Sequence, residues 1–203
     1  MKKRYIYILS IGLILLFFIL GYLYAGLKFA KPHFHANFLM YINGQRFDFG
    51  LDKYSEDIGK CKVDENITPK DRVHLHENNA DTIHVHHEGV SWGHFFANNN
   101  FYFSDKYLIL DDGKLYKNDD KNKLTFVLNG KIIKNPYNRM MNSEDRLLIN
   151  YGNETEEYIV KERFKKVSEN AGEYNKKYDP GTCSGTNQNS IFFLLEQLLH
   201  INH

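Results

Sequence analysis

The chain of 203 residues has little cysteine and almost no net charge. Cys61 and Cys183 are its only cysteines, and their wide separation excludes a C-x-x-C redox motif and a cysteine zinc knuckle. Lys and Arg number 26 against 25 Asp and Glu, so the basic patch that is typical of nucleic-acid binding is missing. The sequence therefore argues against thiol chemistry and against nucleic-acid recognition as functions. Whether the two cysteines form a long-range disulfide stays open.

Charge is also missing from residues 5–27, an apolar run that is long enough to cross a bilayer. The run follows Lys2, Lys3 and Arg4, and the positive-inside rule then places the chain from about residue 31 outside the cytoplasm. Position 23 is Leu, where a signal peptidase requires a small residue, and no lipobox cysteine follows the run. We therefore predict an uncleaved signal-anchor over residues 1–30, and a single-pass protein of the cell membrane with an extracytoplasmic C-terminal domain.

Histidine, in contrast, is concentrated in residues 72–89, where two H-x-H pairs flank a polar turn. Apolar residues alternate with the histidines on both arms, which predicts a β-hairpin. A two-residue turn would put the imidazoles of the two arms on opposite faces. A three-residue loop over 79–81 instead pairs His76 with His84 and His74 with His86, and we predict this register. It leaves on the core face Val73, Leu75, Ile83 and Val85.

A third H-x-H pair, His33 and His35, alternates with apolar residues in the stretch 33–42. Asn43 and Gly44 then predict a hairpin turn. Ser91 is expected to cap a short helix that brings His94 near the end of the His86 strand. His87 is expected to point away from its neighbours or to begin the exit loop.

Elsewhere the pattern predicts an α+β fold with a β-rich body. Asn129-Gly130 predicts a hairpin within 123–133, and the last strand is expected at 146–151. Asn153 and Glu156 form a capping box for an amphipathic helix. The apolar stripe of this helix contains Val160, Phe164, Val167, Ala171 and Tyr174. The apolar segment 191–199 is too short to span a membrane, so it is expected to dock on the domain, on a partner or at the bilayer surface. The predicted units are the anchor 1–30, the His-containing domain 31–152, the helix 153–178, and the linker and tail 179–203.

The order of elements from His84 to Gly152, with its Asn-Gly-Lys hairpin and the acidic turn before the final strand, resembles a β-grasp layout. It is similar to transcobalamin-like C-terminal and ubiquitin-like extracellular modules. The chain from residue 1 to about 180 also resembles a group of single-anchor prokaryotic extracytoplasmic proteins with HLH…HVH hairpins. The resemblance implies a membrane-tethered, β-grasp-like domain at 84–152. It brings no ligand or activity with it.

Three H-x-H pairs of equal parity on strands with apolar opposite faces indicate a transition-metal site. The candidate ligands are His74, His76, His84 and His86, with His33, His35, His87 or His94 completing the set or forming a second site. Imidazole donors suit Cu and Zn. Because the ligands must be neutral to bind, we expect binding to weaken below about pH 6.5.

The favoured function is buffering, sensing or delivery of Cu or Zn by a membrane-tethered protein. The first alternative is a His-ligated metalloenzyme, such as a cupin-like oxygenase or oxidase. A cupin adds a glutamate shortly after H-x-H, and Glu88 fits this only in part. The second alternative is an envelope interaction domain with an envelope protein as partner, in which the histidines are incidental.

Overall fold

The computed structural model describes residues 2–28, 33–56, 68–76 and 79–176. The chain divides into a unit containing the N-terminal helix and a second unit, the sheet domain, which begins at Pro32. The predictions for Cys61, Cys183 and the segment 191–199 lie outside the described residues. The predicted mixture of helix and sheet is confirmed.

Helix α1 (Lys2–Lys28) contains the uncharged run predicted from the sequence. Its segment Arg4–Tyr24 is long and apolar enough to cross a membrane, and its side chains are not buried against protein. Such a helix fits a membrane anchor or a signal sequence.

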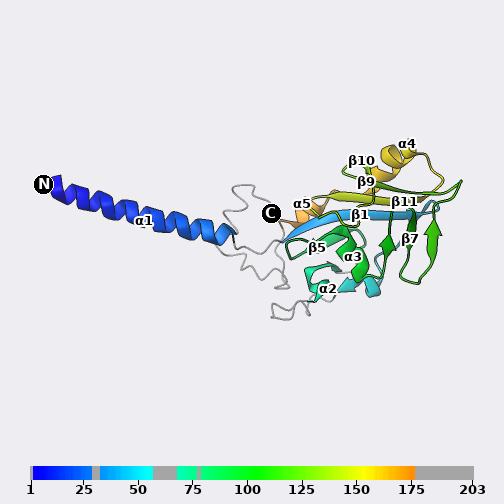
Figure 1. Cartoon of the computed structure of the whole chain (residues 1–203), viewed down its shortest axis with the longest axis horizontal. Coiled ribbons are helices and arrows are strands. Elements are labelled where there is room, and N and C mark those ends of the chain that lie inside the picture. Colours follow the sequence, from blue (N-terminus) through cyan, green and yellow to red (C-terminus); the bar gives the residue numbers. More distant parts are fainter. Residues whose placement is uncertain (1, 29–32, 57–67, 77–78, 177–203) are drawn as a thin grey trace. The chain divides into compact units, whose positions relative to one another are not determined.

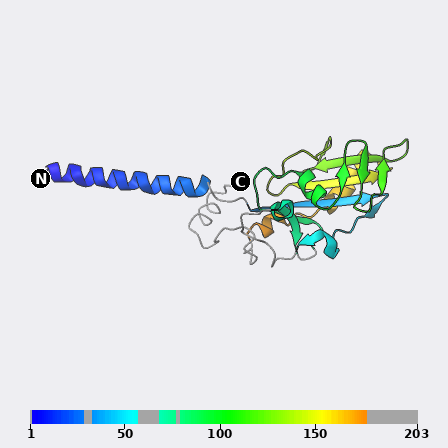
Figure 2. The ribbon, with the colours of Figure 1, turned by 60° about the horizontal axis from the view of Figure 1, so that its bottom comes forward.

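The sheet domain is built around strand β1 (Phe34–Ile42), which lies between β11 (Arg146–Gly152) and β5 (Thr82–Val85). Strands β1 and β11 are parallel, whereas β1 and β5 are antiparallel. Figure 1 shows the long β1 beside β11, and the turned view of Figure 2 keeps the two strands together. Because β1 separates β5 from β11, residues 84–152 do not form this sheet by themselves. The β-grasp likeness stays a prediction.

In the described part of the chain the main sheet has eight strands in the order β10-β9-β11-β1-β5-β4-β3, with β2 pairing β1. The predicted turn at Asn43-Gly44 and the predicted hairpin over 123–133 are both present. The other strands of this sheet are β2 (Gln45–Arg46), β3 (Ser55–Glu56), β4 (Val73–His76), β9 (Lys123–Leu128) and β10 (Lys131–Ile133). A separate sheet contains β6 (Tyr102–Phe103), β7 (Tyr107–Ile109) and β8 (Leu115–Lys117).

The hairpin of β4 and β5 has the predicted parity but a different register. His74 lies opposite His84, and Leu75 lies opposite Ile83. The predicted pairing of His76 with His84 is therefore wrong by two residues, and the loop is longer than three residues. Because the shift is even, the apolar face is unchanged, and Val73, Leu75, Ile83 and Val85 are fully buried.

The main core lies on the apolar face of β1 and β5, under helix α3 (Trp92–Asn98). Ser91 caps α3 as predicted, since its hydroxyl accepts from the His94 backbone N–H. Gly93 is required there because an added Cβ would collide with the backbone oxygen and ring of Tyr137. The cap and this close approach fix α3 against the sheet, with Trp92, Phe95 and Phe96 buried.

The predicted helix over 153–178 forms only in short pieces. The N-cap is Thr155 rather than Asn153, and the helical turns end at Val167, whose backbone is extended. The turns still bury Phe164 and Val167 in a second core beside β1, as the apolar stripe requires. The short helical elements are η1 (Asp52–Tyr54), α2 (Pro69–Arg72), α4 (Glu156–Tyr158), η3 (Ile159–Arg163), η4 (Phe164–Lys166) and α5 (Ala171–Tyr174).

Candidate metal centre

Six histidines from three adjacent strands meet on one face of the sheet. The register of β1 with β5 sets His35 opposite His84, and the register of β5 with β4 sets His84 opposite His74. Neighbouring strands lie about 4.8 Å apart, so these three imidazoles form a row across the sheet. His33, His76 and His86 lie two residues along the strands from this row and have the same parity. Period-two alternation therefore puts all six side chains on the face opposite the main core.

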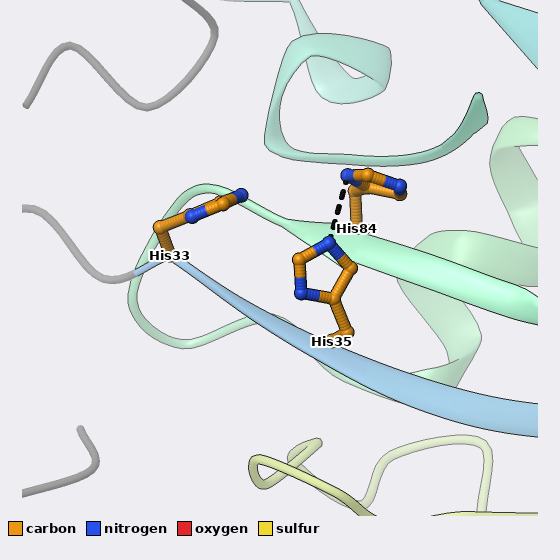
Figure 3. A group of neighbouring side chains, drawn as sticks. All are labelled: His33, His35 and His84. Atoms are coloured by element: carbon orange, nitrogen blue, oxygen red, sulfur yellow. Dashed lines mark hydrogen bonds between the residues drawn. The ribbon is translucent and has the colours of Figure 1, made fainter. Parts of the chain in front are cut away.

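The six imidazoles form two triads with nitrogens close enough to share an ion. The first triad is His33, His35 and His84, and the second is His74, His76 and His86. Within each triad, one ring nitrogen from each residue lies within 4.8 Å of the others. Figure 3 shows the first triad, in which the rings of His35 and His84 point toward one another with Nε2 and Nδ1 3.0 Å apart.

The two triads are in direct contact. The ring of His84 lies 4.2 Å from that of His35 in its own triad and 4.3 Å from that of His76 in the other, between centroids. The ring of His86 lies 5.0 Å from His33 and 5.0 Å from His74. The histidines therefore form one continuous cluster, which we call the histidine cluster.

Backbone carbonyls orient two rings of the second triad. The Nδ1 of His74 lies 2.5 Å from the carbonyl oxygen of Lys70, and the Nδ1 of His76 lies 3.4 Å from that of Glu56. A carbonyl oxygen only accepts, so each contact is favourable when Nδ1 carries the proton and Nε2 carries the lone pair. Such hydrogen bonds commonly fix the tautomer of metal-bound histidine.

The two Nε2 atoms of His74 and His76 then face one another at 2.8 Å. If both rings are neutral and both donate through Nδ1, two lone pairs meet at this distance. Turning one ring into the other tautomer removes that repulsion but puts a lone pair against a carbonyl oxygen. A cation between the Nε2 atoms, either an added proton or a metal ion, satisfies every contact at once. Burial lowers the pKa of His74 to about 4, which disfavours the added proton at neutral pH. This pair of ring nitrogens is the clearest indication of a metal site.

A side chain from the C-terminal part of the domain orients the first triad. The Oδ1 of Asn175 lies 2.8 Å from the Nδ1 of His35 and accepts from the His35 backbone N–H at 2.8 Å. The amide of Asn175 donates to Ser143, which is consistent with this orientation of the side chain. His35 thereby presents Nε2 toward His84. The ring of Tyr174 lies 5.6 Å from that of His35 and closes this side of the cluster.

His86 is buried with both ring nitrogens unsatisfied among the described residues. A buried polar group without a hydrogen bond costs about 1–3 kcal/mol, so this arrangement is unfavourable unless a ligand joins it. Burial, together with the neighbouring His74 and His33, holds the pKa of His86 well below its usual range. Burial and His76 likewise lower the pKa of His74 to about 4. His74 and His86 therefore stay neutral in the folded protein well below pH 6.5, the ordinary value for a free imidazole.

His87 and His94 do not join either triad. His87 follows the end of β5, and its Nδ1 accepts from Arg72 at 3.2 Å. His94 is exposed on α3, where its Nδ1 accepts from the Ser91 backbone N–H at 3.1 Å as half of the capping box. His94 thus has a local structural role, which the sequence pattern Ser-x-x-His did not reveal. The carbonyls of Lys70 and Glu56 and the side chain of Asn175 were also missed, because these contacts depend on tertiary structure.

No protein-family model, curated protein or solved structure matches the chain. The functional assignment therefore rests on the geometry of the histidine cluster and on helix α1.

Proposed function

We propose that this protein is a membrane-tethered, extracytoplasmic transition-metal-binding protein that buffers, senses or delivers Cu or Zn through the histidine cluster. The observation that carries the proposal is the contact of 2.8 Å between the Nε2 atoms of His74 and His76, whose Nδ1 atoms both face carbonyl oxygens. The unsatisfied ring of His86 completes the same triad.

The donor set favours Cu(II) or Zn(II). Imidazole nitrogen suits both ions, and affinity for a nitrogen site peaks at Cu(II). The thioether of Met40 is buried on the opposite face of β1, so it does not provide a soft ligand for Cu(I). Two nitrogens bound to Zn(II) at about 2.0–2.1 Å and a tetrahedral angle are about 3.3 Å apart. The rings of His74 and His76 would need to separate by about half an ångström.

Helix α1 and the charges at its N-terminal end support the membrane and topology part of the proposal. Lys2, Lys3 and Arg4 lie in the first turn of α1, ahead of its uncharged stretch of spanning length. The full-length protein should pellet with membranes and resist carbonate extraction, and protease should reach the sheet domain only from outside the cell. Recovery of a soluble form that starts near residue 26 would identify a cleaved signal sequence instead.

Elemental analysis of the full-length protein tests metal binding directly. The protein is purified in detergent through a removable tag that contains no histidine, then loaded with Cu(II) or Zn(II) and desalted. We expect bound metal in the wild type and none in the His76→Gln/His84→Gln double variant, which removes one ligand from each triad. His94→Gln is the matched control, because His94 lies outside the cluster and Gln can keep the capping box. Metal binding that survives the double variant would refute the site.

A further inference from the structure

We infer that the histidine cluster holds two transition-metal ions side by side, one in each triad, and that the pair takes a small anion as a shared ligand. This inference rests on the proposed function and adds the number of ions and the chemical class of an exogenous ligand. It follows from the number of donors, from the contacts between the triads and from the charge of the cluster.

The donor count exceeds what one ion takes from protein. A single Zn(II) site generally has four ligands, of which a catalytic or exchangeable site takes three from protein. The cluster offers six imidazoles in two groups of three, each mutually close. A mononuclear site would leave at least two of these imidazoles without an ion. Four of the six are nearly inaccessible to solvent: His35, His74, His76 and His86.

The contacts between the triads place the two ions within about one imidazole ring of each other. His84 belongs to the first triad, and its Nδ1 lies 3.0 Å from the Nε2 of His35. Its ring also lies 4.3 Å from that of His76 in the second triad. His33 and His86, from different triads, stack at 5.0 Å with an angle of 14° between their planes. The two ion positions are therefore adjacent, with imidazole rings of one triad packed against those of the other.

The charge of such a pair calls for an anion. Two divalent ions bring four positive charges to six neutral imidazoles. Among the described residues, the groups of potential ligands that contain these histidines include no carboxylate. Neighbouring cations repel strongly where water is excluded, and three imidazoles leave at least one coordination position open on each ion. A small anion bound to both ions, of the class of hydroxide or azide, offsets that repulsion.

Copper titration of full-length protein in detergent distinguishes the possibilities. We expect two Cu(II) per chain in the wild type and in the His94→Gln control, and one in either His33→Gln or His76→Gln, since each removes a ligand from one triad. The electron paramagnetic resonance spectrum of the wild type should show a magnetically coupled pair, and each single-triad variant should give one uncoupled Cu(II). Circular dichroism of every variant verifies that the fold is retained.

Azide is the probe for the anion. It should bind the copper-loaded wild type at least tenfold more tightly than either single-triad variant, as followed by its charge-transfer absorption. Equal azide affinity in all three proteins would overturn the shared-anion assignment, and two uncoupled Cu(II) in the wild type would overturn the pairing. One Cu(II) per chain, lost in either variant, would refute the second ion but keep the proposed function. A wild type without bound copper or zinc would refute both.

Discussion

His86 provides a sharp test because replacing it should stabilise the metal-free protein. Its ring is buried and neither nitrogen has a hydrogen-bond partner among the described residues. Leaving a buried polar group unsatisfied costs about 1–3 kcal/mol, and replacing it with an apolar group of similar size removes that cost. In the presence of a chelator, His86→Leu should therefore raise the free energy of unfolding by about 1–3 kcal/mol.

The sign should reverse when metal is present. A ligand at one thousand times its dissociation constant stabilises the folded state by about 4.1 kcal/mol, which exceeds the gain of the metal-free variant, and the wild type obtains it from the triad that His86 completes. The variant loses that ligand, so metal should stabilise it less than it stabilises the wild type. The order of stability of the two proteins then depends on whether metal is bound, as expected for a residue kept for binding rather than for folding.

Urea unfolding followed by the fluorescence of Trp92 measures both effects, because Trp92 is the single tryptophan and is fully buried in the sheet domain. His86→Asn is the matched control. It keeps a polar group without partners and leaves a small cavity, so it should be less stable than the wild type with the chelator present. If His86→Leu is also less stable than the metal-free wild type, the argument from unsatisfied nitrogens is wrong.

Three further predictions concern acid, tautomer control and packing. In the metal-free protein the pKa of His74 is about 4, against about 6.5 in the unfolded chain, so the unfolded state takes up the proton first. Stability is therefore present above pH 6.5 and is lost as pH falls toward 4, by about 3 kcal/mol for this residue, which urea unfolding at several pH values measures. Asn175→Leu should weaken metal binding about 10- to 100-fold in chelator competition, whereas Asn175→Asp, which keeps an acceptor for the Nδ1 of His35, should retain it. Gly93→Ala should lower the free energy of unfolding by about 1–3 kcal/mol, because the added methyl collides with the Tyr137 backbone oxygen; an unchanged midpoint in thermal unfolding would contradict this.

The alternation of histidine with apolar residues predicted which face of each strand the ligands occupy, because side chains alternate with a period of two. The same periodicity leaves the register open, since any even shift gives the same faces. The side chain of Asn79 accepts from the backbone N–H groups of Asp81 and Thr82 at 3.2 Å, which builds a longer loop than a tight hairpin turn. Several residues of the turn favour such geometry, so the sequence does not single out a loop length.

The pairing of β1 with β5 and the contacts of the C-terminal segment could not be predicted. They join residues far apart in the chain, and no local pattern encodes them. The side chain of Asn170 lies 2.7 Å from the amide of Asn37 and 3.0 Å from the hydroxyl of Thr82, in a buried network on β1 and β5. These hydrogen bonds hold the segment around Asn170 across the sheet. The apolar stripe had predicted that this segment belongs to an uninterrupted helix. The stripe predicted the burial of Phe164 and Val167 correctly, because burial depends on apolarity more than on the backbone path.

Because β1 lies in the middle of the sheet, the ligands available to a metal ion depend on whether the ion arrives before or after the domain has folded. Four of the histidines belong to the hairpin: His74 and His76 on β4, His84 on β5, and His86 directly after β5. They lie close together in the chain, so formation of this short hairpin brings them together early. His35 is 49 positions from His84, and β1 also pairs with β11, which is synthesised much later. Non-local pairings of this kind form slowly. A metal ion that meets the chain before β1 has docked finds only the hairpin ligands, whereas an ion that arrives after folding finds both triads assembled.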